Sequence, residues 1–205
     1  MPDHRTSHSD DVEPRAVDAA PDLPVGVIES YGDWPAPFDA ARLVRRLLRS
    51  VPGRYLAGLR SVVLTTTGTL NRARRRQTTR SRGKKVRVAT CAGLYHHASR
   101  GEPAWIELFV DTVVESTPRL LLRLPLWRDL EISSVLFHEL GHHIHETLDP
   151  EHREPEVVAE AWCRRLSRAY FRRRYWYLVP LVVALRPFGA MALRRAERRM
   201  AATGR

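Results

Sequence analysis

The chain has 205 residues, 28% of them charged, and a formal net charge of +11 at pH 7. This length suffices for one sizeable hydrophobic core, while the charge and the 14 prolines indicate segments that lie outside it. The two cysteines, Cys91 and Cys163, lie far apart and form no CxxC pair, which favours reduced thiols in a cytoplasmic protein over a disulfide framework.

Residues 1–37 are predicted to form an acidic, disordered N-terminal tail. The first 25 or so contain prolines and almost no large apolar side chains, which is typical of a segment that cannot bury enough surface to fold. They include no apolar stretch of the kind found in secretory signals, so we expect no signal peptide.

The positive charge is concentrated after this tail. Residues 1–40 contain two Arg and nine Asp or Glu, which leaves 32 basic and 14 acidic residues in 41–205. A field of this sign attracts nucleic acid or an anionic membrane. However, 32 of the 34 basic residues are Arg. Because Arg, Ala and Pro have GC-rich codons, a GC-rich genome accounts for much of the bias without any ligand.

Residues 38–170 are predicted to form the folded domain. Residues 38–49 carry a partial apolar stripe and indicate a first amphipathic helix, and residues 61–67 indicate a strand. The run 72–87 has nine basic residues in sixteen and no aromatic side chain on which bases would stack. It predicts a solvated loop between strands and no specific nucleic-acid site.

Two further strands are predicted at residues 87–95 and 104–115, the second of them rich in Val, Ile, Phe and Trp. Tyr95, His96 and His97 fall at or beyond the end of the first of these strands. A phenol or imidazole in such a place either stabilises an oxyanion or faces solvent. No role is assigned to these three residues.

The letters HELGH at 138–142 form an HExxH pattern inside a segment with helical periodicity. His138 and His142 share one face of this helix, where they can bind one metal ion while Glu139 acts on water. The opposite face is apolar and is formed by Leu136, Phe137, Leu140 and Ile144. Gly141 lacks a side chain, so another segment can approach the helix closely there.

A catalytic zinc ion usually has three protein ligands and a position for water, so a third ligand is expected downstream. Pro155 suits the first position of a helix, and the following residues continue in a helical pattern. Glu156 and Glu160 then share one face. Glu156 is the preferred third ligand, with Glu160 as the alternative. The carboxylate that does not bind the metal is expected to accept the outer N–H of a ligand histidine and fix its tautomer.

The motifs HELGH at 138–142 and EVVAEAW at 156–162 resemble those of the gluzincin class of zinc metallopeptidases. The most similar group is the small ImmA/IrrE-like group, with its E-x-x-A-[ND]-x-F-A pattern. The resemblance covers residues from about 90 to 170. The chain departs from the pattern at Glu160, Trp162 and Cys163, where the group has Asn or Asp, Phe and Ala. The resemblance implies a zincin-like domain in which a strand before the metal helix pairs with extended substrate.

Residues 171–205 are predicted to form a basic and apolar helical segment. Residues 175–193 are nearly all apolar and are flanked by arginines, and their number is about that of a membrane span. Arg186 and two prolines interrupt this stretch. Three interpretations stay open: a kinked helix pair packed on the domain, an interfacial or re-entrant membrane anchor, and a true span.

Together these features predict a single α+β zincin-like domain, with a small mixed or antiparallel sheet packed on the HExxH helix and the glutamate helix. The predicted activity is hydrolysis of peptide bonds, with His138, His142 and Glu156 holding Zn²⁺ and Glu139 acting as the general base. The expected partners are a peptide or protein substrate and an anionic membrane. The expected location is the cytoplasm or the inner face of a membrane. The alternative is a non-catalytic metal-binding protein that docks on a membrane or nucleic acid through its basic surface.

Overall fold

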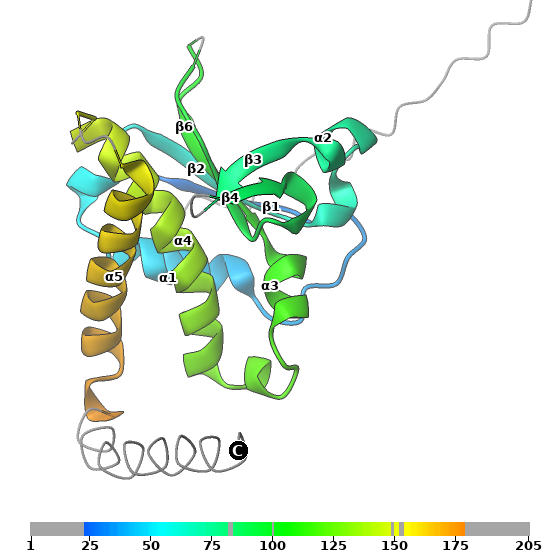
Figure 1. Ribbon diagram of the computed structural model, residues 1–205. Coiled ribbons are helices and arrows are strands. Elements are labelled where there is room, and N and C mark those ends of the chain that lie inside the picture. Colours follow the sequence, from blue (N-terminus) through cyan, green and yellow to red (C-terminus); the bar gives the residue numbers. More distant parts are fainter. Residues whose placement is uncertain (1–22, 82–83, 100, 149, 152–153, 179–205) are drawn as a thin grey trace, which may run out of the picture. The chain divides into compact units, whose positions relative to one another are not determined.

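The computed structural model describes residues 23–81, 84–99, 101–148, 150–151 and 154–178 (Figure 1). The chain divides into two compact units, residues 1–167 and 168–205. The first unit contains both sheets and every predicted site residue. The second begins within the helix α5 (Pro155–Arg174) and includes the short 3₁₀ helix η5 (Trp176–Leu178).

The larger sheet has four strands in the order β1-β2-β6-β5. Three of them, β1 (Gly26–Ser30), β2 (Leu59–Thr65) and β6 (Ala104–Phe109), run parallel to one another. The edge strand β5 (Gly93–His96) runs antiparallel to β6. The sheet is therefore mixed, and the predicted α+β class is confirmed.

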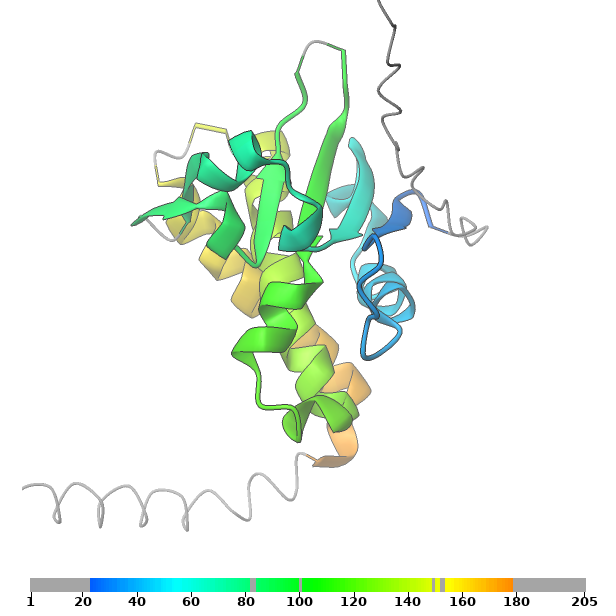
Figure 2. The same ribbon diagram turned by 90° about the vertical axis from the view of Figure 1, so that its right-hand side faces the viewer.

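Two helices pack on this sheet and enclose the main core. Helix α1 (Ala40–Arg49) contacts β1 and α4 (Pro125–Leu148), and α4 contacts β5 and β6. Figure 2 shows the helices and the sheet from the side. The fully buried side chains of this core come from the two helices and the central strands: Val44, Leu47, Leu48, Val62, Leu64, Ile106, Leu108, Ile132, Leu136, Phe137, Leu140 and Ile144. The predicted apolar face of the HExxH helix is thus buried, which leaves its histidine face for a site.

The basic run 72–87 is not the predicted loop. It forms the short helix α2 (Arg72–Arg76) and a hairpin of β3 (Thr78–Ser81) and β4 (Lys84–Arg87). Asn71 caps α2 by accepting the backbone N–H of Arg74. Both terminal nitrogens of Arg74 donate to Glu107, a buried residue of β6. The described residues of the run thus form regular structure, and one of its charges has a buried partner far along the chain.

Both strands predicted before the metal helix are shorter than expected. The segment 87–95 is split by a 3₁₀ turn, Val88–Thr90, so β5 starts only at Gly93. The segment 104–115 is a strand only up to Phe109 and continues as α3 (Val110–Ser116). Buried Asp111 accepts hydrogen bonds from the backbone N–H and the hydroxyl of Thr67, at 2.7 and 2.6 Å. This contact fixes the first turn of α3 to the loop after β2, and the helix forms in spite of its β-branched residues, whose preference depends on tertiary context.

The folded domain begins earlier than residue 38. Strand β1 lies within the range predicted to be a disordered tail, and it is held by parallel pairing with β2 and by burial of Val25 and Val27. The first helix and the strand after it lie where they were predicted, as α1 and β2. Among the described helices, none combines the length and apolar character needed to cross a bilayer. The predicted C-terminal segment lies outside the described residues from position 179 onwards.

Candidate metal centre

The HExxH residues lie in the second half of α4, where the helix passes beneath the edge strand β5. His138 and Glu139 are buried, and His142 is partly exposed. Helix α5 begins at Pro155, as predicted, and carries Glu156 in its first turn. The two motifs therefore come from two helices joined by a short connection.

The two helices touch backbone to backbone at Gly141. A methyl group on Gly141 would lie 2.5 Å from the carbonyl oxygen of Ala159 and 2.7 Å from its Cα atom, closer than any side-chain carbon can approach. On α4, His138 and His142 flank this contact, and on α5, Glu156 lies one turn before it. The close approach of the helices thus brings the two histidines and the glutamate together.

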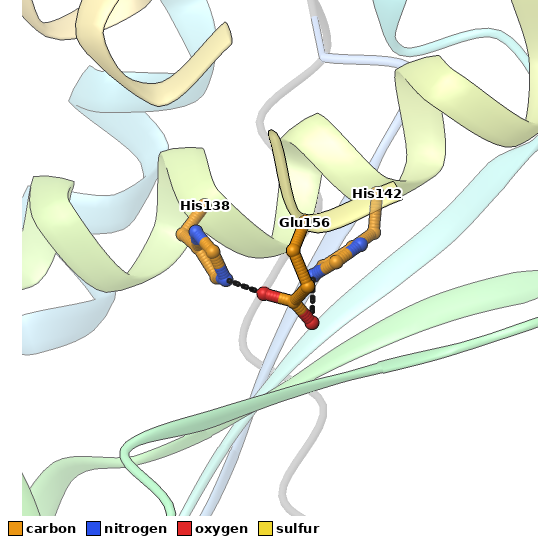
Figure 3. Close-up of side chains that lie close together, drawn as sticks. All are labelled: His138, His142 and Glu156. Atoms are coloured by element: carbon orange, nitrogen blue, oxygen red, sulfur yellow. Dashed lines mark ion pairs between the residues drawn. The ribbon is translucent and has the colours of Figure 1, made fainter. Parts of the chain in front are cut away.

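Figure 3 shows these three side chains pointing toward one another. Glu156 Oε2 is 3.6 Å from His138 Nε2, and Glu156 Oε1 is 3.7 Å from His142 Nε2. One ligand atom of each residue lies within 4.8 Å of those of the other two. A tetrahedral zinc ion with ligands about 2.1 Å away holds them about 3.4 Å apart, so the cluster has nearly the size that zinc requires.

The environment of Glu156 also fits a cation. Its Oε2 atom is buried and accepts no hydrogen bond within the described part of the chain. A buried carboxylate oxygen without a donor costs about 1–3 kcal/mol or more, which a bound cation would remove. Burial, and after it the neighbouring His145 and His97, lower the pKa of His142 to about 4. At neutral pH this imidazole is uncharged, which is the form that binds a metal.

Glu160 lies on the other side of His138. Its Oε2 atom is 3.7 Å from His138 Nδ1, whereas Nε2 of the same ring faces Glu156. Glu160 is also more exposed than Glu156, and its Oε1 atom is 3.4 Å from Arg164. Of the two carboxylates predicted as ligands, Glu156 is therefore the one grouped with both histidines, and Glu160 is placed to orient one of them.

Two hollows meet at the cluster. The first, of about 270 Å³, lies between α4, the start of α5, β5 and the hairpin. It is lined by Thr79, Gly93, Leu94, Tyr95, His97, His138, Glu139, His142, Pro155 and Glu156. The second, of about 420 Å³, follows α5 and is lined by His138, Glu156, Val157, Glu160 and Arg164. The three clustered residues are therefore accessible from a cleft.

Glu139 is positioned by a glycine that sequence reasoning missed. A methyl group on Gly93 would lie 2.9 Å from Glu139 Cγ, 3.1 Å from Glu139 Oε1 and 2.6 Å from a methyl carbon of Val135. Strand β5 can lie against α4 at this point only because residue 93 has no side chain. The only sequence signal was a glycine inside a predicted strand, which indicates a close backbone approach.

The three unassigned residues at the end of β5 have different environments. The Tyr95 hydroxyl lies 3.2 Å from His143 Nδ1, and His143 Nε2 lies 3.0 Å from the Ala57 carbonyl oxygen. Burial lowers the pKa of His143 despite that carbonyl. The neutral ring donates from Nε2 to that carbonyl, and its Nδ1 atom faces the Tyr95 hydroxyl, which also forms a hydrogen bond with Glu146. His96 contacts buried Glu107, and His97 pairs with Glu146 at the cleft rim.

Comparison of the chain with protein-family models, curated proteins and solved structures found no match.

Proposed function

We propose that this protein is a zinc-dependent metallopeptidase that hydrolyses peptide bonds. The observation that carries the proposal is the grouping of His138, His142 and Glu156 within 4.8 Å, beside Glu139 and at the floor of a cleft. Two imidazoles and one carboxylate are a ligand set of catalytic zinc sites, which keep a fourth position for water. A purely structural zinc site is usually closed by four protein ligands.

When bound, Zn²⁺ would polarise the scissile carbonyl and lower the pKa of water toward 7. Glu139 lies next to the ligand His138 and lines the same hollow as all three ligands. Its carboxylate would accept a proton from the attacking water and donate it to the leaving amine. Gly93 lies close against the Glu139 side chain, so strand β5 limits the space in which this carboxylate can move.

An extended peptide is the substrate form that suits this cleft. Strand β5 is an edge of the larger sheet and has β6 as its one strand neighbour in the described part of the chain. Gly93, Leu94 and Tyr95 of this strand line the hollow above the cluster. A substrate segment that adds to this edge by β-augmentation would pass over the ligand residues. The proposal therefore predicts cleavage of flexible or unfolded polypeptide.

The test uses the full chain, loaded with one equivalent of Zn²⁺ and incubated with an unfolded protein such as reduced casein. We expect about one zinc per chain and new peptide termini detected by mass spectrometry. His142→Ala should lose most of the bound zinc, because two ligands hold the ion far less tightly than three. Glu139→Gln should keep the zinc and lose hydrolysis, since an amide does not accept the proton.

A variant of the same helix serves as a matched control. Glu131→Gln removes a carboxylate two turns before the motif, and Glu131 does not line the cleft at the cluster. This variant should retain zinc and activity. Zinc binding without hydrolysis in the wild-type protein would support the alternative, a non-catalytic metal-binding protein. Equal hydrolysis by wild type and Glu139→Gln would refute the proposed mechanism.

A further inference from the structure

The first unit has an exposed group of leucines in the residues that lead into α4 and in its first turns. The histidines of the metal cluster lie in the second half of the same helix. We propose that Leu120, Leu124, Leu126 and Leu130 form, with Arg119 and Arg123, a surface that docks on an anionic lipid membrane. We call these six residues the leucine-arginine surface. The inference goes beyond the proposed peptidase activity and does not depend on it.

The leucines are exposed although their backbone is well held. Leu120 is 72% exposed and Leu124 is 52% exposed, and Leu126 and Leu130 are 37% and 42% exposed. Between them, Leu122 is buried, and the backbone N–H of Leu124 donates to the Leu121 carbonyl in a 3₁₀ turn. An ordered turn thus points leucines into water. Single exposed leucines are ordinary, but four within eleven residues indicate an interaction surface.

The two charged residues within this surface are both arginines, and the nearest acids that reach solvent, Glu115 and Glu131, lie just outside it. Arg119 and Arg123 are exposed, whereas the one acid between residues 117 and 130, Asp129, is fully buried and pairs with Arg46 of α1 at 2.6 Å. Within the described part of the chain, neither Arg119 nor Arg123 forms an ion pair. Leucines beside such arginines match the two layers of a bilayer surface, because acyl chains accept the leucines and anionic headgroups attract the arginines. Nucleic acid would match the arginines but leave the leucines in water.

The chain's own C-terminal residues are the other candidate occupant. Residues 179–193 are nearly all apolar, whereas 194–205 contain five Arg and one Glu, a net charge of the same sign as that of the surface. The fluorescence measurement below distinguishes this occupant from a membrane. In the second unit, the exposed side chains of Trp176 and Tyr177 are of the types enriched at bilayer interfaces.

The test is co-sedimentation of the full chain with vesicles of phosphatidylglycerol and phosphatidylcholine, compared with vesicles of phosphatidylcholine alone. We expect binding to the anionic vesicles and at least about tenfold weaker partitioning to the neutral ones. Replacing both Leu120 and Leu124 by Ser should weaken binding to the anionic vesicles by about tenfold or more. Replacing Arg119 and Arg123 together by Gln should have an effect of similar size.

Matched controls come from elsewhere in the same unit. Leu148→Ser changes a leucine of equal exposure, 55%, at the opposite end of α4, and the pair Arg42→Gln and Arg49→Gln removes two exposed arginines of α1. Both control proteins should bind as the wild type does. Failure of the wild type to bind anionic vesicles would overturn the proposal, and so would wild-type binding by the double leucine variant.

A second measurement separates the membrane from an internal occupant. Leu120→Cys, labelled with an environment-sensitive fluorophore, should show a water-like emission in buffer and a blue shift on addition of anionic vesicles. The native cysteines are buried and should remain unlabelled in the folded chain. A label already blue-shifted in buffer would mean that the chain itself covers the leucines, and this result would also overturn the proposal.

Discussion

Replacing Gly141 by Ala tests whether the backbone contact between the two helices positions the third ligand. The new methyl group would lie 2.5 Å from the Ala159 carbonyl oxygen, whereas ordinary contacts begin at 3.4 Å. The helices must separate by about 0.9 Å at this point, because the neighbouring atoms belong to the backbone and have no rotamer to change. Glu156 would move with its helix, away from His138 and His142.

The expected change in the free energy of unfolding is the difference between a gain in helix propensity and a cost of overpacking. Alanine in a helix interior is favoured over glycine by about 1 kcal/mol. Overpacking costs about 1–3 kcal/mol, so the free energy of unfolding should stay equal or fall by up to about 2 kcal/mol. Metal–ligand distances tolerate about 0.2 Å, several times less than the required shift. The affinity for zinc should therefore fall by at least about tenfold, even if the protein remains folded.

The assay is a competition titration of zinc against a chromophoric chelator, with the free energy of unfolding measured by urea denaturation. Gly53→Ala is the matched control, since a methyl group at position 53 would meet no atom within 4 Å. It should leave the zinc affinity unchanged. If Gly141→Ala binds zinc as tightly as wild type and gains about 1 kcal/mol in stability, the close contact does not position the site and our reasoning is wrong.

Three further predictions concern single residues. Glu156→Ala should reduce zinc affinity more than Glu160→Ala, for which a loss of about 10–100-fold is expected, and the opposite order in a zinc titration would reverse the two assignments. Gly93→Ala should keep zinc but lower the rate of casein cleavage, because its methyl group displaces Glu139; an unchanged rate would contradict this positioning role. Burial raises the pKa of Glu107, but hydrogen bonds and charges from its two basic neighbours hold it below its ordinary value of 4.5. Its contribution to stability should be complete above that value and lost as the pH falls through the lowered one, so urea denaturation from pH 7 to 3 should show a steeper loss in wild type than in Glu107→Gln.

The sequence by itself determined the features that depend on neighbours a few residues away. His138 and His142 share a helix face because they are one turn apart, and the apolar residues opposite them face the core for the same reason. Pro155 marked the start of the second helix because its ring fixes a helical backbone angle and its missing N–H is not needed there. Gly141 was recognised as a point where another segment can approach the helix closely, because glycine has no side chain.

Tertiary structure decided the features whose partners lie far along the chain. Residues 110–116 have strand-forming side chains but form a helix, whose first turn is fixed to Thr67 through Asp111. Arg74 of the basic run pairs with Glu107, a buried residue 33 positions further along the chain. The contact of Gly93 with Glu139 needed a strand and a helix to be brought together. The local sequence pattern predicts whether a segment prefers to form a helix or a strand. The free energy of burying a charge or a backbone contact depends on partners far along the chain, which a short stretch of sequence does not contain.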